Sequence, residues 1–545
     1  MSDNYSQYEN SDKYVPSKSV WSYIKSQTQR FRSDTVVQQD EATGEMLTIK
    51  ELSEKVETLA SSLQKLGLTS GIGICSENNL YCTWILLGAL HAGVRCSLLS
   101  PRYTERELKH CVELTRPEVI ICSKMVANNI YENGESFGAV CSNYSFIKSI
   151  FVCDTTIPEN SVYKSLATLL PSEVEYENKI PADRTFEPTR EALVLASSGS
   201  TGLPKGVVWT HKSIVEALKL SYMFAKNGET ALGLMPFFHA YGIICNFMCL
   251  CEGSRFIILS KFNGPKCLIN FIESHQINNL YLIPSLLASI VNSSEFTKEK
   301  LSCVRYVCTS AGKMSNRLQE KVAESFPSDA VLRHGYGMTE TTFIALLGPY
   351  KKNDSTGKLV PPMKCQVISE GKICGIKEIG ELCFKGPTIM KCYLNNEKAT
   401  AEALPEDGWL RSGDLGYFDK DGDFFVVDRM KDMIKYQGNQ VSPVEIEETI
   451  LELPDVLEAA VFAVPSEEFG ELPAAAIVAK KNSKLMAQEI EEYVARQLSP
   501  HNKLRGGVFF FAELPKTGNG KLQRKALLSR IQNSFGESKM TRTQG

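Results

Sequence analysis

The sequence has little excess charge of either sign and no long uninterrupted apolar run. Its 60 lysine and arginine residues nearly balance 63 aspartate and glutamate residues, for a net charge of −3. That balance argues against a protein that binds nucleic acid through a basic surface. The most apolar stretch, residues 242–259, is interrupted by Asn246 and by the polar residues 252–255. It is too broken to cross a membrane, and we expect a buried helix followed by a strand.

Motifs that mark several common classes of protein are also missing. No G-x-G-x-x-G follows a strand-like run and no G-x-S-x-G is present, which argues against hydride transfer and against a hydrolase elbow. The seven histidines show no metal-ligand spacing, so we expect no structural metal site. The 17 cysteines contain no C-x-x-C pair and no secretory signal precedes them, so we expect reduced thiols in a reducing compartment.

Short apolar runs typical of strands alternate with helix-like segments up to about residue 360. This alternation predicts an α/β protein with mostly parallel sheets sandwiched by helices. The strand-like runs are GIGICSE, RCSLLS, EVIICS, SIFVCD, ALVLASS, TALGLMP, RFIILS, NNLYLIP and RYVCTS, and the amphipathic helices include TIKELSEKVETLASSLQKLG and SNRLQEKVAESF.

Beyond about residue 360 the pattern changes to short strands with turns, which predicts a β-rich subdomain. Residues 416–430 are typical of a hairpin with Asp421 and Gly422 at its tip. An EF-hand loop is the weaker interpretation of DKDGD, because its glycine is in the wrong position. The helix–strand–strand–helix order that follows predicts a small α+β domain.

We therefore expect a disordered segment at residues 1–15, a large domain at 16–428 and a small mobile domain at 432–533. A hinge at 429–431 would join the two domains, and a flexible tail would follow at 534–545. No repeat is visible, and we expect a monomer.

Residues 196–207, ASSGSTGLPKGV, combine hydroxyl side chains, glycines and one lysine directly after a strand-like run. A strand, such a loop and then a helix is a common arrangement for holding phosphate oxygens. It is not a Walker loop, because Gly206 follows Lys205 where Ser or Thr would be needed. The weaker alternative is a flexible linker.

Five separated stretches together resemble the adenylate-forming superfamily of acyl-CoA synthetases, 4-coumarate–CoA ligases and insect luciferases, and the insect luciferase-like branch most closely. They are SSGSTGLPKG, MPFFHAYG, HGYGMTETT, the stretch from Trp409 to Glu447, and PKTGNGKLQRK. The resemblance covers nearly the whole chain. It implies that a carboxylic acid attacks the α-phosphate of ATP, and that a second nucleophile, usually the thiol of CoA, then displaces AMP from the acyl-adenylate.

The resemblance implies an ATP site in which hydroxyls, backbone and Lys205 hold the phosphates. Tyr336 would stack on adenine, Thr339 would contact the α-phosphate, and Glu340 would hold Mg²⁺ with phosphate oxygens. Asp414 and Arg429 would hold the ribose. The full expected set is Ser197, Ser198, Gly199, Ser200, Thr201, Gly202, Lys205, Ala311, Gly312, Gly335, Tyr336, Gly337, Met338, Thr339, Asp414 and Arg429. Without the resemblance, the TETT stretch predicts a tight turn ahead of a helix that Thr339 caps.

Two lysines of the small domain are implied to serve the two half-reactions in turn. Lys521 would contact the attacking carboxylate and the α-phosphate. Lys435 would serve the thioester step, and Gln437 would belong to the same CoA site. Gly438 would let pantetheine pass close to the backbone. Both lysines cannot face one cleft in a single pose, so the small domain should rotate about Arg429 and Lys431.

The acid pocket is implied at His239, Tyr241, Ile244 and Phe343. A capped core histidine is the structural alternative for His239. The family's Gly-Gly-Ala-Pro stretch is here Ser310 to Lys313, so the role of Lys313 is in doubt. Ala217 stands where beetle luciferases carry a luciferin-binding arginine, which makes beetle luciferin a poor candidate substrate.

The sequence thus predicts an acyl-CoA ligase that uses ATP, Mg²⁺ and CoA on a medium- or long-chain fatty acid. The rivals are a luciferase that oxygenates its own luciferin with O₂ and a catalytically silent binding protein. We expect a peroxisomal or cytoplasmic protein. Ser538 to Met540 resembles a peroxisomal address, which an import receptor would read only if the native chain ended there.

Overall fold

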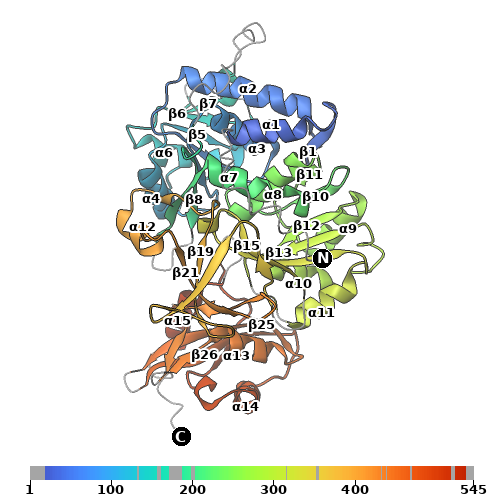
Figure 1. Cartoon of the computed structure of the whole chain (residues 1–545), viewed down its shortest axis with the longest axis vertical. Helices are drawn as coiled ribbons and strands as arrows, with labels where there is room; N and C mark the ends of the chain where they lie inside the picture. The colour runs from blue at the N-terminus through green and yellow to red at the C-terminus, as the bar shows by residue number, and fades with distance from the viewer. Residues whose placement is uncertain are drawn as a thin grey trace.

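Two large sheets with helices between them form the upper part of the molecule (Figure 1). The computed structural model describes residues 19–131, 134–155, 157, 161–170, 187–197, 203–312, 314, 316–350, 355–430, 432–436, 439–466, 469–516 and 522–535. Within these residues one sheet has nine strands, in the order β16-β15-β14-β13-β12-β10-β11-β1-β2. The other has eight, in the order β20-β9-β8-β4-β3-β5-β6-β7.

The centre of each large sheet is parallel, as the sequence predicts. The nine-stranded sheet contains β1 (Val36–Asp40), β2 (Met46–Thr48), β10 (Thr230–Gly233), β11 (Arg255–Ile258), β12 (Asn279–Leu282), β13 (Tyr306–Thr309), β14 (Val331–Gly337), β15 (Ile344–Pro349) and β16 (Lys358–Leu359). The eight-stranded sheet contains β3 (Ile72–Cys75), β4 (Cys96–Leu99), β5 (Val119–Cys122), β6 (Ser149–Val152), β7 (Tyr163–Ser165), β8 (Glu191–Ser197), β9 (Lys205–Thr210) and β20 (Cys392–Tyr393). Each of the nine strand-like runs is a strand.

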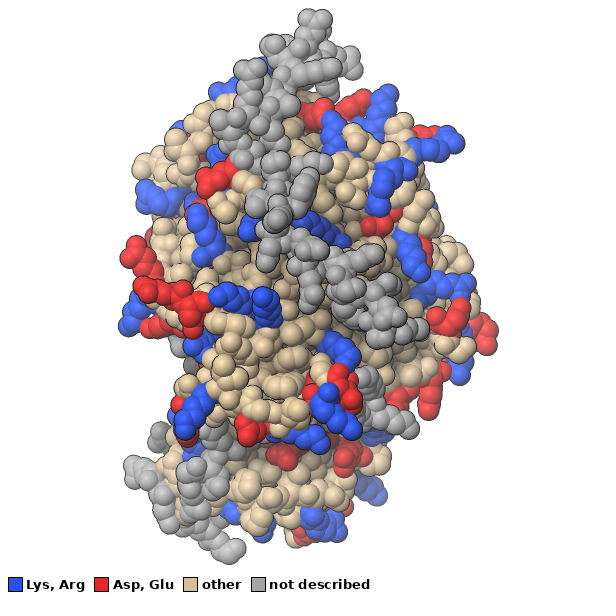
Figure 2. Space-filling model, in the orientation of Figure 1, with Lys and Arg blue, Asp and Glu red and all other residues tan. Residues whose placement is uncertain are grey.

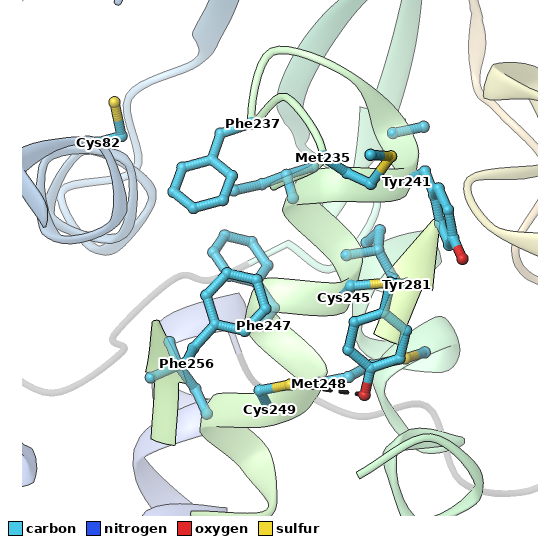
Figure 3. Packing of buried hydrophobic residues seen from close by; sticks show 14 of the residues in the cluster. Cys82, Met235, Phe237, Tyr241, Cys245, Phe247, Met248, Cys249, Phe256 and Tyr281 are labelled. Carbon is cyan, nitrogen blue, oxygen red and sulfur yellow. Dashed lines mark hydrogen bonds between the residues drawn. The ribbon is translucent and has the colours of Figure 1, made fainter. Parts of the chain in front are cut away.

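Helices between the two sheets have few exposed side chains. The helix α8 is buried at every one of its residues, and α3 is buried at nearly all, because each packs on more than one neighbour. Figure 3 shows α8 side chains such as Phe247 and Cys249 packed against Phe256 of β11 and Tyr281 of β12. The helices of this part are α1 (Val20–Thr28), α2 (Ile49–Lys65), α3 (Leu80–His91), α4 (Glu105–Thr115), α5 (Lys124–Ala127), α6 (Phe137–Ser142), α7 (His211–Leu218), α8 (Ala240–Cys251), α9 (Pro265–Ser274), α10 (Pro284–Val291) and α11 (Asn316–Ser325).

A fully buried polar triad crosses this helical layer. The side-chain amide of Gln38 donates to the Thr83 hydroxyl at 2.9 Å and to Asn246 Oδ1 at 2.8 Å. Asn246 donates in turn to Thr83 at 2.8 Å. The polar residue that interrupts the most apolar run of the sequence therefore joins β1, α3 and α8. The run itself is a buried helix and a strand, as predicted.

The remaining two sheets have five strands each. The antiparallel one contains β17 (Lys364–Ser369), β18 (Lys372–Ile373), β19 (Gly380–Lys385), β21 (Leu410–Phe418) and β22 (Phe424–Arg429), with α12 (Glu397–Ala403) nearby. Its β21–β22 hairpin has the expected turn, with Gly422 at φ +74°. The other contains β23 (Ile434–Tyr436), β24 (Asn439–Val441), β25 (Val456–Ser466), β26 (Gly470–Ala479) and β27 (Val508–Phe510). With α13 (Pro443–Leu451), α14 (Ala487–Gln497) and α15 (Arg524–Phe535), it lies at the C-terminal end of the long axis (Figure 1).

One predicted local structure is wrong. The loop after β8 was expected to lead directly into a helix, but β9 intervenes and pairs antiparallel with β8 before α7 begins. The reason is the run KGVVWT, whose β-branched and aromatic residues favour a buried strand. Lys205 is consequently the first residue of a strand rather than the start of a helix.

The surface and the thiols agree with the composition. Figure 2 shows lysine, arginine, aspartate and glutamate side chains interspersed over one face. All 17 cysteines have free thiols. No helix among the described residues has the length and apolar character needed to cross a membrane. These residues also contain no cluster of three or more metal-ligating side chains.

His211 gives the fold a predictable sensitivity to acid. The backbone N–H of Val20, at the start of α1, donates to its Nδ1 at 3.2 Å. Burial, and to a lesser degree the nearby Arg190 charge, lower the pKa of His211 to about 3. The folded state therefore favours the neutral ring. This contribution to stability is complete above the ordinary pKa of about 6.5 and is lost as the pH falls from there toward 3, because the unfolded chain binds the proton first.

We predict that the substitution His211→Asn, which keeps an acceptor for Val20 but cannot titrate, makes unfolding less dependent on pH. Between pH 7.5 and pH 5 the wild-type free energy of unfolding should fall by about 2 kcal/mol more than that of the variant. Urea unfolding at the two pH values measures this difference. Equal losses in both proteins would contradict the assignment of a neutral, buried His211.

Candidate active site

Lys205 and Glu340, which lie 135 positions apart in the sequence, both contact one tyrosine, Tyr393. The hydroxyl of Tyr393 donates to Glu340 Oε1 at 2.8 Å. The Lys205 ammonium lies over the Tyr393 ring, 4.7 Å from its centroid. Tyr393 and Glu340 are both buried, with exposed fractions of 7% and 6%. The expected phosphate-binding lysine and the expected magnesium-binding carboxylate are thus brought together.

Main-chain pairing brings this cluster together. The strand β20 pairs antiparallel with β9, so that Tyr393 lies opposite Val207. A short 3₁₀ turn, η6 (Thr339–Thr341), carries Glu340. Trp209 of β9 holds this turn by donating its indole N–H to the Thr339 carbonyl at 2.7 Å. Sequence reasoning missed both Trp209 and Tyr393, since an aromatic residue in a short apolar run gives no signal of a site.

The turn at Thr339 differs from the expectation drawn from the residues alone. A helix capped by Thr339 was expected, but Met338 precedes a single 3₁₀ turn that leads directly into β15. The reason is that β15 pairs antiparallel with β14, so the chain must reverse within a few residues. Thr342, fully buried, adopts φ +64° in this reversal, and a threonine is strained there.

A second cluster forms where β14 meets the β21–β22 hairpin. Tyr336 donates its hydroxyl to Asp414 Oδ2 at 2.5 Å, and Arg429 Nε lies 3.1 Å from Asp414 Oδ1. Burial first, and then the Asp414 carboxylate, raise the pKa of Tyr336 well above its ordinary value, so the phenol stays protonated. Asp414 and Arg429, the expected ribose pair, are in contact, and Tyr336 hydrogen-bonds to the same carboxylate. Stacking of Tyr336 on adenine stays a prediction.

Glycine is required in the β14 segment that carries these residues. A Cβ on Gly337 would lie 2.4 Å from the Phe343 carbonyl oxygen, and one on Gly335 would lie 2.6 Å from Ile344. The two expected glycines therefore allow β15 to pack closely. Met338 follows them and is half-buried.

His239 borders a cavity of about 710 Å³ that Tyr241 and Ala311 also line. Apolar residues such as Met235 and Leu286 line this cavity together with Arg102, Lys261 and several carboxylates. His239 is the N-cap of α8, its Nδ1 accepting from the Tyr241 N–H at 3.4 Å. The histidine is therefore both a helix cap and a cavity residue.

The departure from the family at Ala311 preserves a glycine-like backbone. Ala311 has φ +67°, in the left-handed region where glycine is the usual residue. Gly312 follows, and an added Cβ there would make only ordinary contacts with Pro284. The main chain at Ala311 thus has a left-handed conformation, which the family's glycine would adopt more easily.

Two of the expected acid-pocket residues lie away from the cavity lining. Ile244 is fully buried in α8. Phe343 packs edge-on against Phe224, with ring centroids 5.1 Å apart. Ala217 is fully buried in α7. The structure therefore groups His239, Tyr241 and Ala311 around the cavity but not Ile244 or Phe343.

In the small sheet, Lys435 of β23 has an exposed side chain, and its backbone N–H donates to Glu471 at 2.8 Å. Hydrogen bonds link this part to the rest: Ser442, the N-cap of α13, and the Val444 N–H donate to Asp428 at 2.6 and 3.3 Å, and Arg317 donates to the Leu451 carbonyl at 3.3 Å. The remaining expected residues lie outside the described part of the chain. They are Ser198, Gly199, Ser200, Thr201, Gly202, Lys313, Lys431, Gln437, Gly438 and Lys521. Ser197, at the end of β8, is buried.

Asn78 holds the loop that leads to His239, and sequence reasoning missed it. Its amide nitrogen donates to the Met235 carbonyl at 2.9 Å and to the Gly233 carbonyl at 3.3 Å. Its oxygen accepts the Phe237 N–H at 2.8 Å. A side-chain amide can satisfy both kinds of backbone group at once, so one residue next to α3 fixes the path of the chain from β10 to α8.

We predict that Asn78→Ala lowers the free energy of unfolding by roughly 2–4 kcal/mol, because it leaves buried backbone groups of the loop without partners. Chemical denaturation measures this loss. As a control, Asn143→Ala at an exposed position should cost less than about 0.5 kcal/mol. A loss as small as the control's would show that the loop does not depend on Asn78.

Comparisons with known proteins agree with this geometry. The AMP-binding enzyme family model matches residues 24–394, and the AMP-binding enzyme C-terminal domain model matches residues 445–521. Luciferin 4-monooxygenase of Photuris pensylvanica is 36% identical over 483 residues, which are 86% of this chain and 87% of the relative. Peroxisomal OPC-8:0-CoA ligase 1 of Arabidopsis thaliana is 32% identical over 527 residues, 94% of this chain and 93% of the relative.

The fold is also shared with solved structures. The structure of ATP-bound MatB from Rhodopseudomonas palustris superposes with a TM-score of 0.81 at 22% identity, covering 95% of this chain and all of that one. The first family model spans more than half of the chain, and the relatives match over most of their length. The chain therefore belongs to the AMP-binding enzyme family and is an adenylate-forming enzyme.

Proposed function

We propose that this enzyme is an ATP-dependent acyl-CoA ligase whose substrate is a medium- or long-chain fatty acid. The observation that carries the proposal is the arrangement of two polar clusters and one cavity. Lys205 and Glu340 both contact Tyr393, Asp414 pairs with Arg429, and His239 borders a cavity that many apolar side chains line. The named CoA ligase from Arabidopsis, similar over nearly its whole length, supports the same reaction class.

In the first half-reaction a carboxylate oxygen of the acid would form a bond to the α-phosphorus of ATP. The bond to the β-phosphate side breaks, and pyrophosphate leaves. Two anions must approach each other in this step, so cationic side chains and hydrogen-bond donors must offset the charge. Lys205 and the loop after β8 would hold the β- and γ-phosphates, Thr339 the α-phosphate, and Asp414 and Arg429 the ribose.

Glu340 fits a magnesium ion by the chemistry of its donor. Mg²⁺ is usually held by one or two carboxylates together with substrate phosphates, and Glu340 is a buried carboxylate beside the proposed phosphate site. When bound, the ion would offset phosphate charge. The lack of a larger ligand cluster among the described residues is compatible with such a site.

In the second half-reaction the sulfur of CoA would attack the acyl carbon of the adenylate and displace AMP, losing its proton. We propose that Lys521 serves the first step and Lys435 the second, with rotation of the small domain between them about residues 429–431. In the described pose the Lys435 side chain is exposed.

A luciferase is the second candidate, favoured by the similarity to luciferin 4-monooxygenase. An adenylate with an acidic α-hydrogen could then react with O₂ instead of CoA. The buried Ala217 and the packing of Phe343 on Phe224 speak against beetle luciferin as the substrate. Peroxisomal import through Ser538 to Met540 stays a prediction, because these residues lie outside the described part of the chain.

We predict that the pure enzyme with ATP, Mg²⁺, CoA and a panel of acids forms AMP and a CoA-dependent thioester from fatty acids. Mass spectrometry measures both products while photons are counted in the same wells, some of them supplied with extract of the source tissue. Light that requires ATP and the extract would favour the luciferase. No adenylate from any acid would contradict both functions.

We further predict that the two lysine variants separate the half-reactions. Lys521→Ala should block adenylate formation but leave thioester formation from supplied adenylate largely intact, and Lys435→Ala should do the reverse. Single-turnover assays of each half-reaction measure the effects. Equal loss of both half-reactions in either variant would be incompatible with two poses.

A further inference from the structure

We propose that Tyr393 is a positioning residue for the metal–nucleotide complex: it orients the Glu340 carboxylate toward Mg²⁺ and holds the Lys205 ammonium over its ring face. No residue of β20 was among those expected at the site. The inference rests on the proposed binding of ATP and Mg²⁺ by this enzyme. It extends that proposal to a residue that would touch neither the reacting carboxylate oxygen nor the α-phosphorus.

The hydroxyl of Tyr393 occupies one oxygen of the carboxylate. It donates to Glu340 Oε1 at 2.8 Å, and both side chains are buried. With Oε1 engaged, rotation of the carboxylate is restricted and Oε2 is left for a cation. Hydrogen bonds of this kind orient metal-binding carboxylates in proteins.

The ring face of Tyr393, rather than a carboxylate, is the contact of the Lys205 ammonium. Lys205 Nζ lies over the ring face, 4.7 Å from the centroid, where a cation is attracted by the aromatic quadrupole. Among the described residues no ion pair joins Lys205 to Glu340. A direct pair between them would neutralise the lysine needed for phosphate and the carboxylate needed for the metal. Contact of the lysine with the ring face, and of the carboxylate with the hydroxyl, leaves both charges available.

The main chain around Tyr393 is held independently of its hydroxyl. Its N–H donates to the Thr400 hydroxyl at 3.0 Å, and Leu394 N–H donates to the Gly206 carbonyl at 2.7 Å. Met390 N–H donates to the Glu340 carbonyl at 2.8 Å. Removing the hydroxyl alone should therefore leave β20 paired with β9, so a phenylalanine tests the hydrogen bond rather than the fold.

The experiment measures nucleotide binding without turnover. The full chain is heated with an ATP analogue whose α,β-bridge is methylene, over a series of Mg²⁺ concentrations and with no acid present. The Mg²⁺ concentration that gives half of the maximal rise in melting temperature is compared between proteins. Tyr393→Phe should need roughly tenfold more Mg²⁺ than the wild type, while stabilisation by AMP alone should not change.

Three further variants make the result specific. Tyr144→Phe removes a similar tyrosine–glutamate hydrogen bond, 3.0 Å to Glu113 on the surface, and should match the wild type. In a Glu340→Gln background, Tyr393→Phe should have no additional effect, because its partner is already altered. Tyr393→Leu, which also removes the ring, should weaken binding of the analogue beyond the change in Mg²⁺ requirement.

An unchanged Mg²⁺ requirement in Tyr393→Phe would overturn the proposal, as would an equal shift in the Glu340→Gln background. If Tyr393→Phe does not fold, the comparison of Tyr393→His, which retains a donor, with Tyr393→Leu decides in the same way. A wild type that the analogue and Mg²⁺ do not stabilise would instead contradict the proposed function. That outcome can be told apart from failure of the inference alone, because the wild type and every variant would then lack the rise in melting temperature.

Discussion

The candidate site depends on the pairing of two short strands, β9 and β20. This pairing places the ring of Tyr393 beside Lys205 and its hydroxyl against Glu340. Trp209, near the other end of β9, holds the turn that carries Glu340. A cation, an aromatic ring and a carboxylate from three distant parts of the chain are consequently fixed by backbone hydrogen bonds. The site can remain ordered without a ligand, as electrostatic preorganisation requires.

The acid side of the site is organised by different means. A single amide, Asn78, satisfies three backbone groups of the loop before α8, and His239 caps that helix. Asn246, which lies in the same helix, accepts a hydrogen bond from Gln38 and donates one to Thr83. Buried polar groups that hydrogen-bond to one another favour one arrangement of a core, because other arrangements would break these bonds. The position of the cavity thus depends on side chains that hold the main chain and the helix around it.

Much of the fold could be read from the sequence, because buried parallel strands form short apolar runs bounded by turns. The strand β9 was missed because a glycine-rich loop before a polar stretch resembles a phosphate loop that opens a helix. At the site, motifs predicted Lys205, Glu340, Asp414 and Arg429, and the structure brings the first two to Tyr393 and the last two into contact. Tyr393, Trp209 and Asn78 could not be predicted, since their importance arises from contacts across 53 to 188 positions. No local pattern records such contacts.

The pairing of β20 with β9 limits where the chain could be cut to give a shorter fragment that folds. Strand β9 is completed by residues 392–393, almost two hundred positions later, so the eight-stranded sheet cannot close its edge until that segment has been synthesised. A fragment that stops earlier would leave the edge of β9 unpaired, and unpaired strand edges promote aggregation. Folding of this sheet on the ribosome must therefore wait for a long-range contact, which slows it. The AMP-binding family model ends at residue 394, directly after this strand, and any shorter fragment would lack the residues that complete the sheet.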